Sequence, residues 1–112
     1  LRSRADFLGW RNFAALKNQA MTINEAINHP NATIIDVRSE GEFAGGHVQG
    51  AVNIPLQTVP DEVEAIKAMQ RPIVLCCASG NRSGQALMYL QAQGLDGLYN
   101  GGGWGQVQIH KM

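Results

Sequence analysis

The sequence has 112 residues, of which 45% are hydrophobic and 16% are charged, and this composition predicts one globular domain. Nine Lys and Arg residues balance nine Asp and Glu residues, so the chain lacks the basic excess that non-specific nucleic-acid binding requires. Apolar runs such as Ile73–Ala78 are far shorter than the ~20 residues that span a bilayer, so we expect no membrane span. Cys76 and Cys77 are adjacent and cannot join distant segments through a disulfide, so we expect free thiols.

Residues 1–20 are predicted to form an extension in front of a domain that occupies residues 21–112. Apolar residues within Leu1–Asn18 recur at roughly helical spacing among four basic residues, which predicts a short amphipathic helix packed against the domain. Docking of this helix on a membrane surface or a partner is the alternative. Because the chain begins with Leu1 rather than Met, we interpret it as a processed form or an excised domain, and we expect a cytoplasmic location.

The domain is predicted to begin with a short helix and a buried strand. Thr22 and Glu25 have the spacing of a capping box, which predicts a short helix that stops before Pro30. A short strand near Met21 would add a fifth strand to the sheet. The segment Thr33–Val37 is rich in β-branched residues and ends in a polar cluster, which predicts a central parallel strand.

Polar residues follow this strand at the edge where open α/β sheets place their sites. Asp36 and Arg38 are expected to pair with each other or to hold turn N–H groups, because neither is readily buried alone. Ser39, with Glu42 at the third helical position, predicts a short helix that ends at a pair of glycines. A second short strand is expected at residues 51–54.

The stretch Ile73–Ser83 combines an apolar strand with a loop that turns into a helix. A cysteine at the end of such a strand meets backbone N–H groups and the positive end of a helix dipole. Both lower the pKa of a thiol and attract anions. The stretch therefore predicts a nucleophilic thiol in an anion-binding loop, with two ordinary buried core cysteines as the alternative.

Two cysteines fit this description, and they imply different chemistries. Counted from Cys76, the pattern is Cys-x5-Arg82-Ser83, which resembles the signature of cysteine-dependent phosphatases and of some arsenate reductases. Counted from Cys77, the loop is one residue shorter. Because neighbouring strand residues point to opposite faces, only one thiol can face the loop. We expect that thiol to be Cys77, which is nearer the turn and therefore the more exposed of the two.

The remaining sequence predicts further helices and one more strand. The segment Leu56–Met69 has an apolar stripe at helical spacing, and Ser83–Gln93 repeats that pattern with Gly94 as its stop. The last strand is expected at Leu98–Asn100, followed by a flexible turn of three glycines and a final short helix from Trp104. Strands that alternate with helices predict an α/β fold with a parallel sheet of four to five strands and helices on both faces.

Three motifs closely resemble those of the rhodanese family, and they occur in that family's order. The first spans Ile34–Ala51, with Val48-Gln49 where the family usually has Ile-Pro; the second is Cys77–Ser83; the third is the Gly-Gly-Trp that ends at Trp104. The resemblance covers nearly the whole chain. It implies the rhodanese-like α/β fold and the activity of a single-domain thiosulfate sulfurtransferase.

The resemblance also implies a mechanism and a set of site residues. Cys77 would be the catalytic nucleophile, which takes a sulfane sulfur from thiosulfate or a similar anion, holds it as a persulfide and passes it to cyanide, a thiol or a protein sulfur acceptor. No metal or organic cofactor is implied, and the three histidines show no ligand spacing with the cysteines. The residues implied to bind the substrate are Ala78, Ser79, Gly80, Asn81, Arg82 and Ser83.

Several alternatives remain open at this point. A phosphatase or arsenate reductase would use Cys76 and Arg82, and a non-catalytic protein-binding domain would use neither. Asp36 and His47 could join a cysteine in a catalytic triad, whereas the family resemblance implies structural roles for both. Trp104 could lie beside the active site or could be an ordinary core residue.

Overall fold

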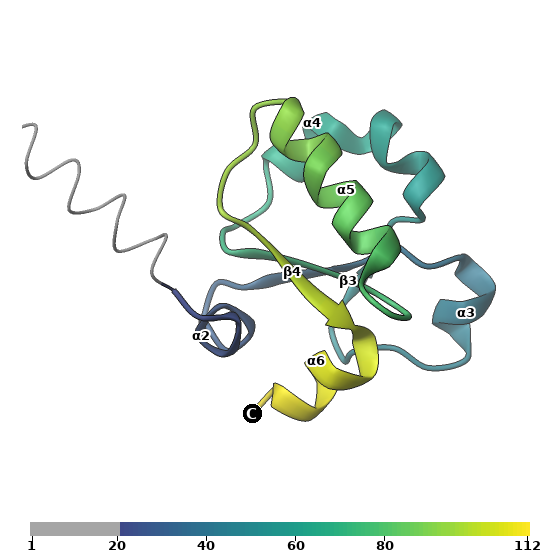
Figure 1. Cartoon of the computed structure of the whole chain (residues 1–112), viewed down its shortest axis with the longest axis vertical. Helices are drawn as coiled ribbons and strands as arrows, with labels where there is room; N and C mark the ends of the chain where they lie inside the picture. Colours follow the sequence, from purple (N-terminus) through teal and green to yellow (C-terminus); the bar gives the residue numbers. More distant parts are fainter. Residues whose placement is uncertain (1–20) are drawn as a thin grey trace, which may run out of the picture.

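A sheet of four parallel strands forms the centre of residues 21–112, the part of the chain that this computed structural model describes (Figure 1). The sheet confirms the predicted α/β architecture, and the helix predicted within residues 1–20 lies outside the described residues. In spatial order, the strands are β2 (Val52–Asn53), β1 (Thr33–Asp36), β3 (Ile73–Cys77) and β4 (Leu98–Gly103).

The fifth strand that was predicted near Met21 is absent from the described residues, which begin at Met21. Thr22 is instead the N-cap of α2 (Ile23–Ile27). Its hydroxyl accepts a hydrogen bond from the Glu25 N–H at 3.1 Å, and its own N–H donates to the Glu25 carboxylate at 2.8 Å. The predicted capping box is therefore confirmed. It occupies the backbone N–H that a strand at this point would have to offer to its neighbour.

Helices cover both faces of the sheet, so that neighbouring residues of each strand enter different cores. Leu75 and Cys77 face the layer that contains α5, whereas Val74 and Cys76 face the layer that contains α2 and α6. Figure 1 shows these two layers on opposite sides of the strands. Within residues 21–112 the further helices are α3 (Glu40–Ala44), the 3-10 helix η1 (Leu56–Glu62), α4 (Val63–Lys67), α5 (Asn81–Ala92) and α6 (Trp104–His110).

The helix predicted over Leu56–Met69 is two helices, and Pro60 gives the reason. Proline has no N–H for an α-helical hydrogen bond and its ring crowds the preceding turn, so η1 keeps the tighter 3-10 form before α4 begins. Val59 and Ile66 still face the core, as the apolar stripe predicted. The helix that follows β3 begins at Asn81, two residues before the predicted start. The helix ends at Ala92, and Gly94, the predicted stop, follows the C-cap residue Gln93 with a left-handed φ of 90°.

The glycines predicted as a flexible turn continue β4 instead. The pairing of β3 with β4 shifts between Leu75 and Cys76, which leaves Gly101 as an extra residue on β4. A Cβ on Gly101 would lie 2.8 Å from side-chain carbons of Val74 and Val107. At these distances a residue with a Cβ atom at position 101 would force its neighbours to shift. None of the helices in residues 21–112 has the length and apolar character needed to cross a membrane.

Candidate active site

Cys77 ends β3 and lies at the N-terminus of α5. Gly80 adopts a left-handed conformation with φ 97°, which turns the chain sharply into the helix. The Cys77 Sγ accepts hydrogen bonds from the N–H of Gly80 at 3.0 Å and from the N–H of Ser83 at 3.4 Å, and the Ser83 hydroxyl oxygen lies at 3.4 Å. No side chain of α5 caps its first turn. The sulfur therefore takes the place of an N-cap oxygen.

These contacts change the acidity of the Cys77 thiol. Burial alone would raise its pKa. Hydrogen bonds from the Ser83 hydroxyl and from the N–H groups of Ser83, Ser79 and Gly80 outweigh burial and lower the pKa from 9.0 to about 7. A larger fraction of Cys77 is therefore ionised near neutral pH than of an ordinary cysteine. A thiolate is the nucleophilic form of cysteine, so the loop supplies an activated sulfur.

Cys76 lies on the opposite face of the sheet, as strand alternation predicted. Burial raises the pKa of its thiol to about 12, and the negative charge of Asp36 adds to this effect. The expectation that Cys77 is the more exposed cysteine was wrong, because both residues have an exposed fraction of 0%. The two thiols differ in their hydrogen-bond donors rather than in their exposure.

The side chains of the loop differ in size and in exposure. Ala78, Ser79 and Asn81 are exposed, Gly80 is half-buried, and Ser83 is fully buried. Of the six residues predicted to bind substrate, the structure therefore brings Gly80 and Ser83 directly against Cys77, with the Ser79 N–H also directed toward it. No hydrogen bond to Cys77 is made by Ala78, Asn81 or Arg82 within the described part of the chain.

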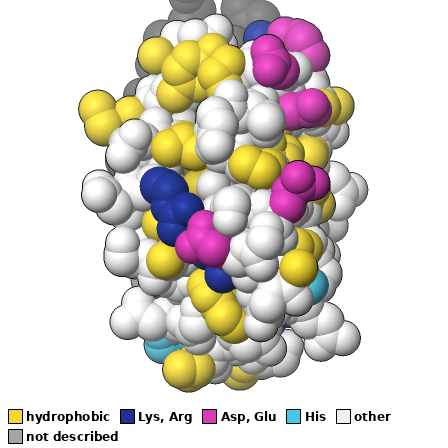
Figure 2. All heavy atoms as spheres, turned by 90° about the vertical axis from the view of Figure 1, so that its right-hand side faces the viewer, with side chains coloured by type: hydrophobic (Ala, Val, Ile, Leu, Met, Phe, Trp, Pro, Cys, Tyr) yellow, Lys and Arg dark blue, Asp and Glu magenta, His cyan; other side chains and the backbone are white. Residues whose placement is uncertain are grey.

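Arg82 forms a two-pronged ion pair with Glu42, a partner that the sequence did not indicate. Its Nη1 lies 2.7 Å from Glu42 Oε1 and its Nη2 lies 3.0 Å from Glu42 Oε2. The hydrogen bond from Arg82, followed by that from the Ser39 N–H, lowers the pKa of Glu42 to about 2. Figure 2 shows a basic side chain directly against an acidic one on the face that carries α3. Glu42 had been predicted only as a helix-capping residue.

Asn100 is a second neighbour of the loop that sequence reasoning missed. Its Oδ1 accepts hydrogen bonds from the Ser83 hydroxyl at 2.7 Å and from the Gly102 N–H at 3.0 Å, and its Nδ2 donates to the Gly80 carbonyl at 3.1 Å. Asn100 therefore links β4 to both the loop and α5. In the sequence it was only the last polar residue of a predicted strand, and no local pattern distinguished it.

Asp36 and Arg38 form a buried pair at the end of β1, as expected. The Arg38 Nη2 lies 2.7 Å from Asp36 Oδ2, and it also donates to the Gly46 carbonyl at 2.6 Å. The guanidinium lies 4.8 Å from the ring centroid of Trp104. His47 contacts the Phe43 carbonyl at 2.8 Å and stacks on the Phe43 ring. In residues 21–112 neither Asp36 nor His47 is hydrogen-bonded to Cys77, so a catalytic triad is not formed.

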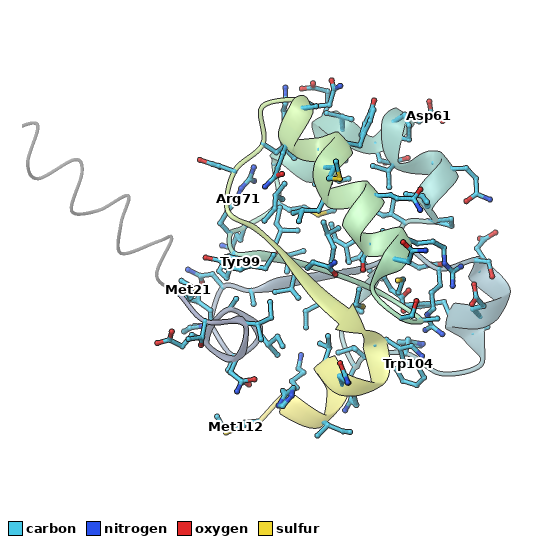
Figure 3. The ribbon with its side chains drawn as sticks, in the orientation of Figure 1. Met21, Asp61, Arg71, Tyr99, Trp104 and Met112 are labelled. Atoms are coloured by element: carbon cyan, nitrogen blue, oxygen red, sulfur yellow. The ribbon has the colours of Figure 1, made fainter. Side chains whose placement is uncertain are left out.

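Trp104 combines the two interpretations that the sequence left open. Figure 3 shows it at the junction of β4 and α6, below the loop that follows β3. Its ring is half-buried against the core that contains Cys76. A Cβ on Gly46 would lie 3.1 Å from the ring, and Arg38 covers the ring face. Trp104 therefore holds the segment around Gly46 in place beside the loop.

A hollow of about 450 Å³ lies elsewhere, over α2 and the start of β1. Its lining includes Ile27, Thr33, Val52 and Met112, and it contains no residue of the loop. Within residues 21–112 no three His, Cys, Asp or Glu side chains lie close enough together to share a metal ion. At Cys77 the chain presents a buried sulfur that accepts hydrogen bonds from N–H groups at the N-terminus of α5.

Curated proteins of similar sequence include both uncharacterised proteins and sulfurtransferases. The uncharacterised protein YqhL of Bacillus subtilis is 41% identical over 69 residues, which cover 62% of this chain and 54% of YqhL. The thiosulfate sulfurtransferase GlpE of Pseudomonas fluorescens is 29% identical, with 68% of this chain and 69% of GlpE covered. The thiosulfate sulfurtransferase PspE of Escherichia coli is 34% identical, with 70% of this chain and 76% of PspE covered.

Solved structures show the same fold. A rhodanese with anions from E. coli is 33% identical and has a TM-score of 0.61, covering 67% of this chain and 89% of its own. The human single-domain sulfurtransferase TSTD1 is 26% identical, also with a TM-score of 0.61, covering 73% of this chain and 84% of its own. The family model of the rhodanese-like domain matches residues 19–109. Because this match covers most of the chain, the chain belongs to the rhodanese family.

Proposed function

We propose that this protein is a sulfurtransferase that carries sulfane sulfur on Cys77. The observation that carries the proposal is the surroundings of this sulfur: two N–H groups donate to Cys77 Sγ, and the Ser83 hydroxyl, which can turn to donate as well, lies 3.4 Å away. N–H donors arranged in this way stabilise negative charge on one sulfur without having to reorganise. The names of the GlpE and PspE relatives support thiosulfate, or an anion of similar chemistry, as the donor.

In the first step, the Cys77 thiolate attacks the outer sulfur of thiosulfate. A bond forms between the two sulfur atoms, the original sulfur–sulfur bond of thiosulfate breaks, and sulfite leaves with the electron pair. The enzyme then holds a persulfide whose negative charge lies on the terminal sulfur. The N–H groups of Ser79, Gly80 and Ser83 are the groups that would stabilise this atom.

In the second step, an acceptor removes the terminal sulfur. Cyanide or an acceptor thiolate attacks that atom, the bond to Cys77 Sγ breaks, and the Cys77 thiolate leaves with the electron pair. The lowered pKa of Cys77 assists both steps, because it increases the nucleophilic form in the first step and improves the leaving group in the second. Ala78 and Ser79 are small and exposed, so the loop that covers the buried sulfur lies at the surface, where an acceptor thiol on a small molecule or on a protein would approach.

Intact-mass measurement of the purified protein tests this proposal. Incubation with thiosulfate should add the mass of one sulfur atom, and cyanide should remove it with release of thiocyanate. The Cys76→Ser variant should behave in the same way, whereas Cys77→Ser should gain no mass. An unmodified wild-type protein after incubation with several sulfane donors would contradict the proposal.

No observation favours the phosphatase or arsenate reductase alternative. Cys76 faces the other core, and its thiol, with a pKa of about 12, stays protonated. Both prongs of Arg82, which would have to grip a tetrahedral anion, are engaged by Glu42. The acidity of Cys77 argues against a domain that only binds proteins, because an acidic thiol is not needed for that role.

A further inference from the structure

The orientation of the Asn100 side-chain amide is determined by two backbone groups. Its Oδ1 faces the Gly102 N–H at 3.0 Å, and its Nδ2 faces the Gly80 carbonyl at 3.1 Å. Exchange of the amide oxygen and nitrogen would place two donors against each other and two acceptors against each other. The atom that faces the Ser83 hydroxyl at 2.7 Å is therefore the oxygen.

This geometry decides where the single proton of the Ser83 hydroxyl goes. Asn100 Oδ1 has no proton to give, so in the 2.7 Å contact the hydroxyl must be the donor. The Cys77 Sγ lies farther from the same hydroxyl oxygen, at 3.4 Å. While the proton points to Asn100, the hydroxyl presents a lone pair to the sulfur. That arrangement suits a protonated thiol, which can donate, and does not suit a thiolate.

We propose that Asn100 is a positioning residue that holds the Ser83 hydroxyl away from Cys77 and so opposes ionisation of the thiol. The N–H groups of Gly80 and Ser83 are fixed by the turn and the helix, whereas a hydroxyl rotates. The Ser83 hydroxyl is thus the adjustable donor among the described contacts of Cys77. It points to Asn100 when the sulfur is protonated and turns to the sulfur when the sulfur is charged.

The proposal extends to the sulfur-transfer cycle, and this extension alone rests on the proposed function. When Cys77 carries a second sulfur, the negative charge lies on the outer atom and Sγ is neutral. The Ser83 hydroxyl then returns to Asn100. The two acceptors would thus hold the same proton in alternation as the enzyme is loaded and discharged.

The charged groups around the loop are already paired. Arg82 of α5 is held by Glu42 of α3, and Asp36 and Arg38 hold each other at the end of β1. The neighbouring thiol of Cys76 is protonated. None of these groups changes in the variants below, so their contributions to the titration of Cys77 cancel in each comparison.

A double-mutant cycle tests the proposal through the pH midpoint of Cys77 alkylation by iodoacetamide, followed by peptide mass. Asn100→Ala is compared in the wild-type and the Ser83→Ala backgrounds, because loosening of Gly80 affects both backgrounds equally. Asn100→Ala should lower the pH midpoint in the wild-type background. This decrease should exceed any decrease in the Ser83→Ala background by about half a pH unit or more. Equal shifts in the two backgrounds would overturn the proposal.

Two further variants distinguish the proposed effect from a general disturbance of the fold. Asn100→Asp keeps an acceptor for Ser83 and strengthens it, so it should raise the midpoint, and more so in the wild-type background than in Ser83→Ala. A lower midpoint would count against the proposal.

Asn28→Ala is the matched control. The Asn28 side chain also bridges separate segments, since it donates to the His110 carbonyl and accepts from the Met112 N–H, and neither contact involves the loop. This variant should leave the midpoint unchanged. The assay needs no sulfur donor, so it remains decisive even if sulfur transfer is not detected.

Discussion

Two adjacent cysteines, both fully buried, have thiols of very different acidity. The pleat of β3 directs Cys77 toward the N-terminus of α5 and Cys76 toward the opposite core. Cys77 gains hydrogen-bond donors that outweigh its burial, whereas burial and the nearby charge of Asp36 raise the pKa of Cys76 despite the opposing charge of Arg38. One step along the chain therefore changes a pKa from about 12 to about 7.

Substitution of each cysteine should separate the two thiols in function. Cys77→Ser should abolish sulfur transfer from thiosulfate to cyanide, because serine is not ionised near neutral pH and forms no persulfide. Cys76→Ser should keep a large part of the activity, since Cys76 faces the other core. Steady-state thiocyanate production measures both. The reverse order of activities would exchange the roles of the two residues.

At Asp36 we expect a loss of stability rather than a loss of chemistry. Asp36→Ala would leave the Arg38 guanidinium buried without its carboxylate, which costs on the order of 3 kcal/mol. His47→Ala should cost about 1 kcal/mol, because His47 makes an exposed contact with the Phe43 carbonyl. Urea unfolding gives both values, with turnover expressed per folded molecule. Lost turnover at unchanged stability would instead indicate a catalytic role.

At the scale of elements, the Glu42–Arg82 pair joins α3 to α5 beside the loop. Glu42 also caps α3, where it accepts a hydrogen bond from the Ser39 N–H at 3.1 Å. A donor anion that approaches Cys77 therefore meets an arginine whose charge is already largely neutralised. The pair is partly exposed, so we attribute to it little stability and a larger effect on anion capture.

Opposite changes in donor capture are expected when the two partners are altered. Arg82→Ala should lower kcat/KM for thiosulfate while cyanide discharges a preloaded persulfide at a similar rate. Glu42→Gln should raise kcat/KM for thiosulfate several-fold, because Arg82 then keeps its full charge for the incoming dianion. Stopped-flow loading and discharge separate the two steps. A decrease in donor capture in Glu42→Gln would show that the pair is required intact.

The glycine run of β4 provides a matched pair of substitutions. Gly101→Ala would place a Cβ 2.8 Å from carbons of Val74 and Val107, both fully buried, so we expect a cost of about 1–3 kcal/mol. Gly105→Ala meets nothing within 4 Å and lies in α6, so it should be neutral or slightly stabilising. Thermal unfolding compares the two. Equal stability of both variants would show that β4 shifts easily.

Local patterns in the sequence predicted most of the elements. The Thr22 and Ser39 capping boxes and the β-branched runs depend on residues a few positions apart, and they were found where predicted. The contacts of Arg82 with Glu42 and of Ser83 with Asn100 were missed, because they form only when three parallel strands end at one edge. Strand alternation likewise predicted which face of the sheet each cysteine occupies, but it did not predict that both cysteines are fully buried.

At the scale of the whole molecule, the sheet brings distant segments to one edge. The register aligns Asp36 with Cys76 and Cys77 with Gly103, so the carboxyl ends of β1, β3 and β4 surround the loop. Close approach of β4 to the loop needs a glycine, since a Cβ on Gly103 would lie 2.9 Å from the Ala78 carbonyl oxygen. The acidity of Cys77 therefore depends on the fold being intact.

That dependence links folding stability to pH, with opposite signs for the two thiols. Folding lowers the pKa of Cys77 from 9.0 to about 7, so the unfolded chain binds more protons in this interval and stability should rise from pH 7 to 9. Folding raises the pKa of Cys76 to about 12, so stability should fall above pH 9.

Thermal unfolding of the wild type and of the two serine variants, measured from pH 7 to above pH 9, isolates the effect of each thiol. Cys77→Ser should remove the rise between pH 7 and 9, and Cys76→Ser should reduce the alkaline fall, while groups common to all three proteins cancel. Parallel stability curves for the wild type and Cys77→Ser would show that the loop does not favour the thiolate.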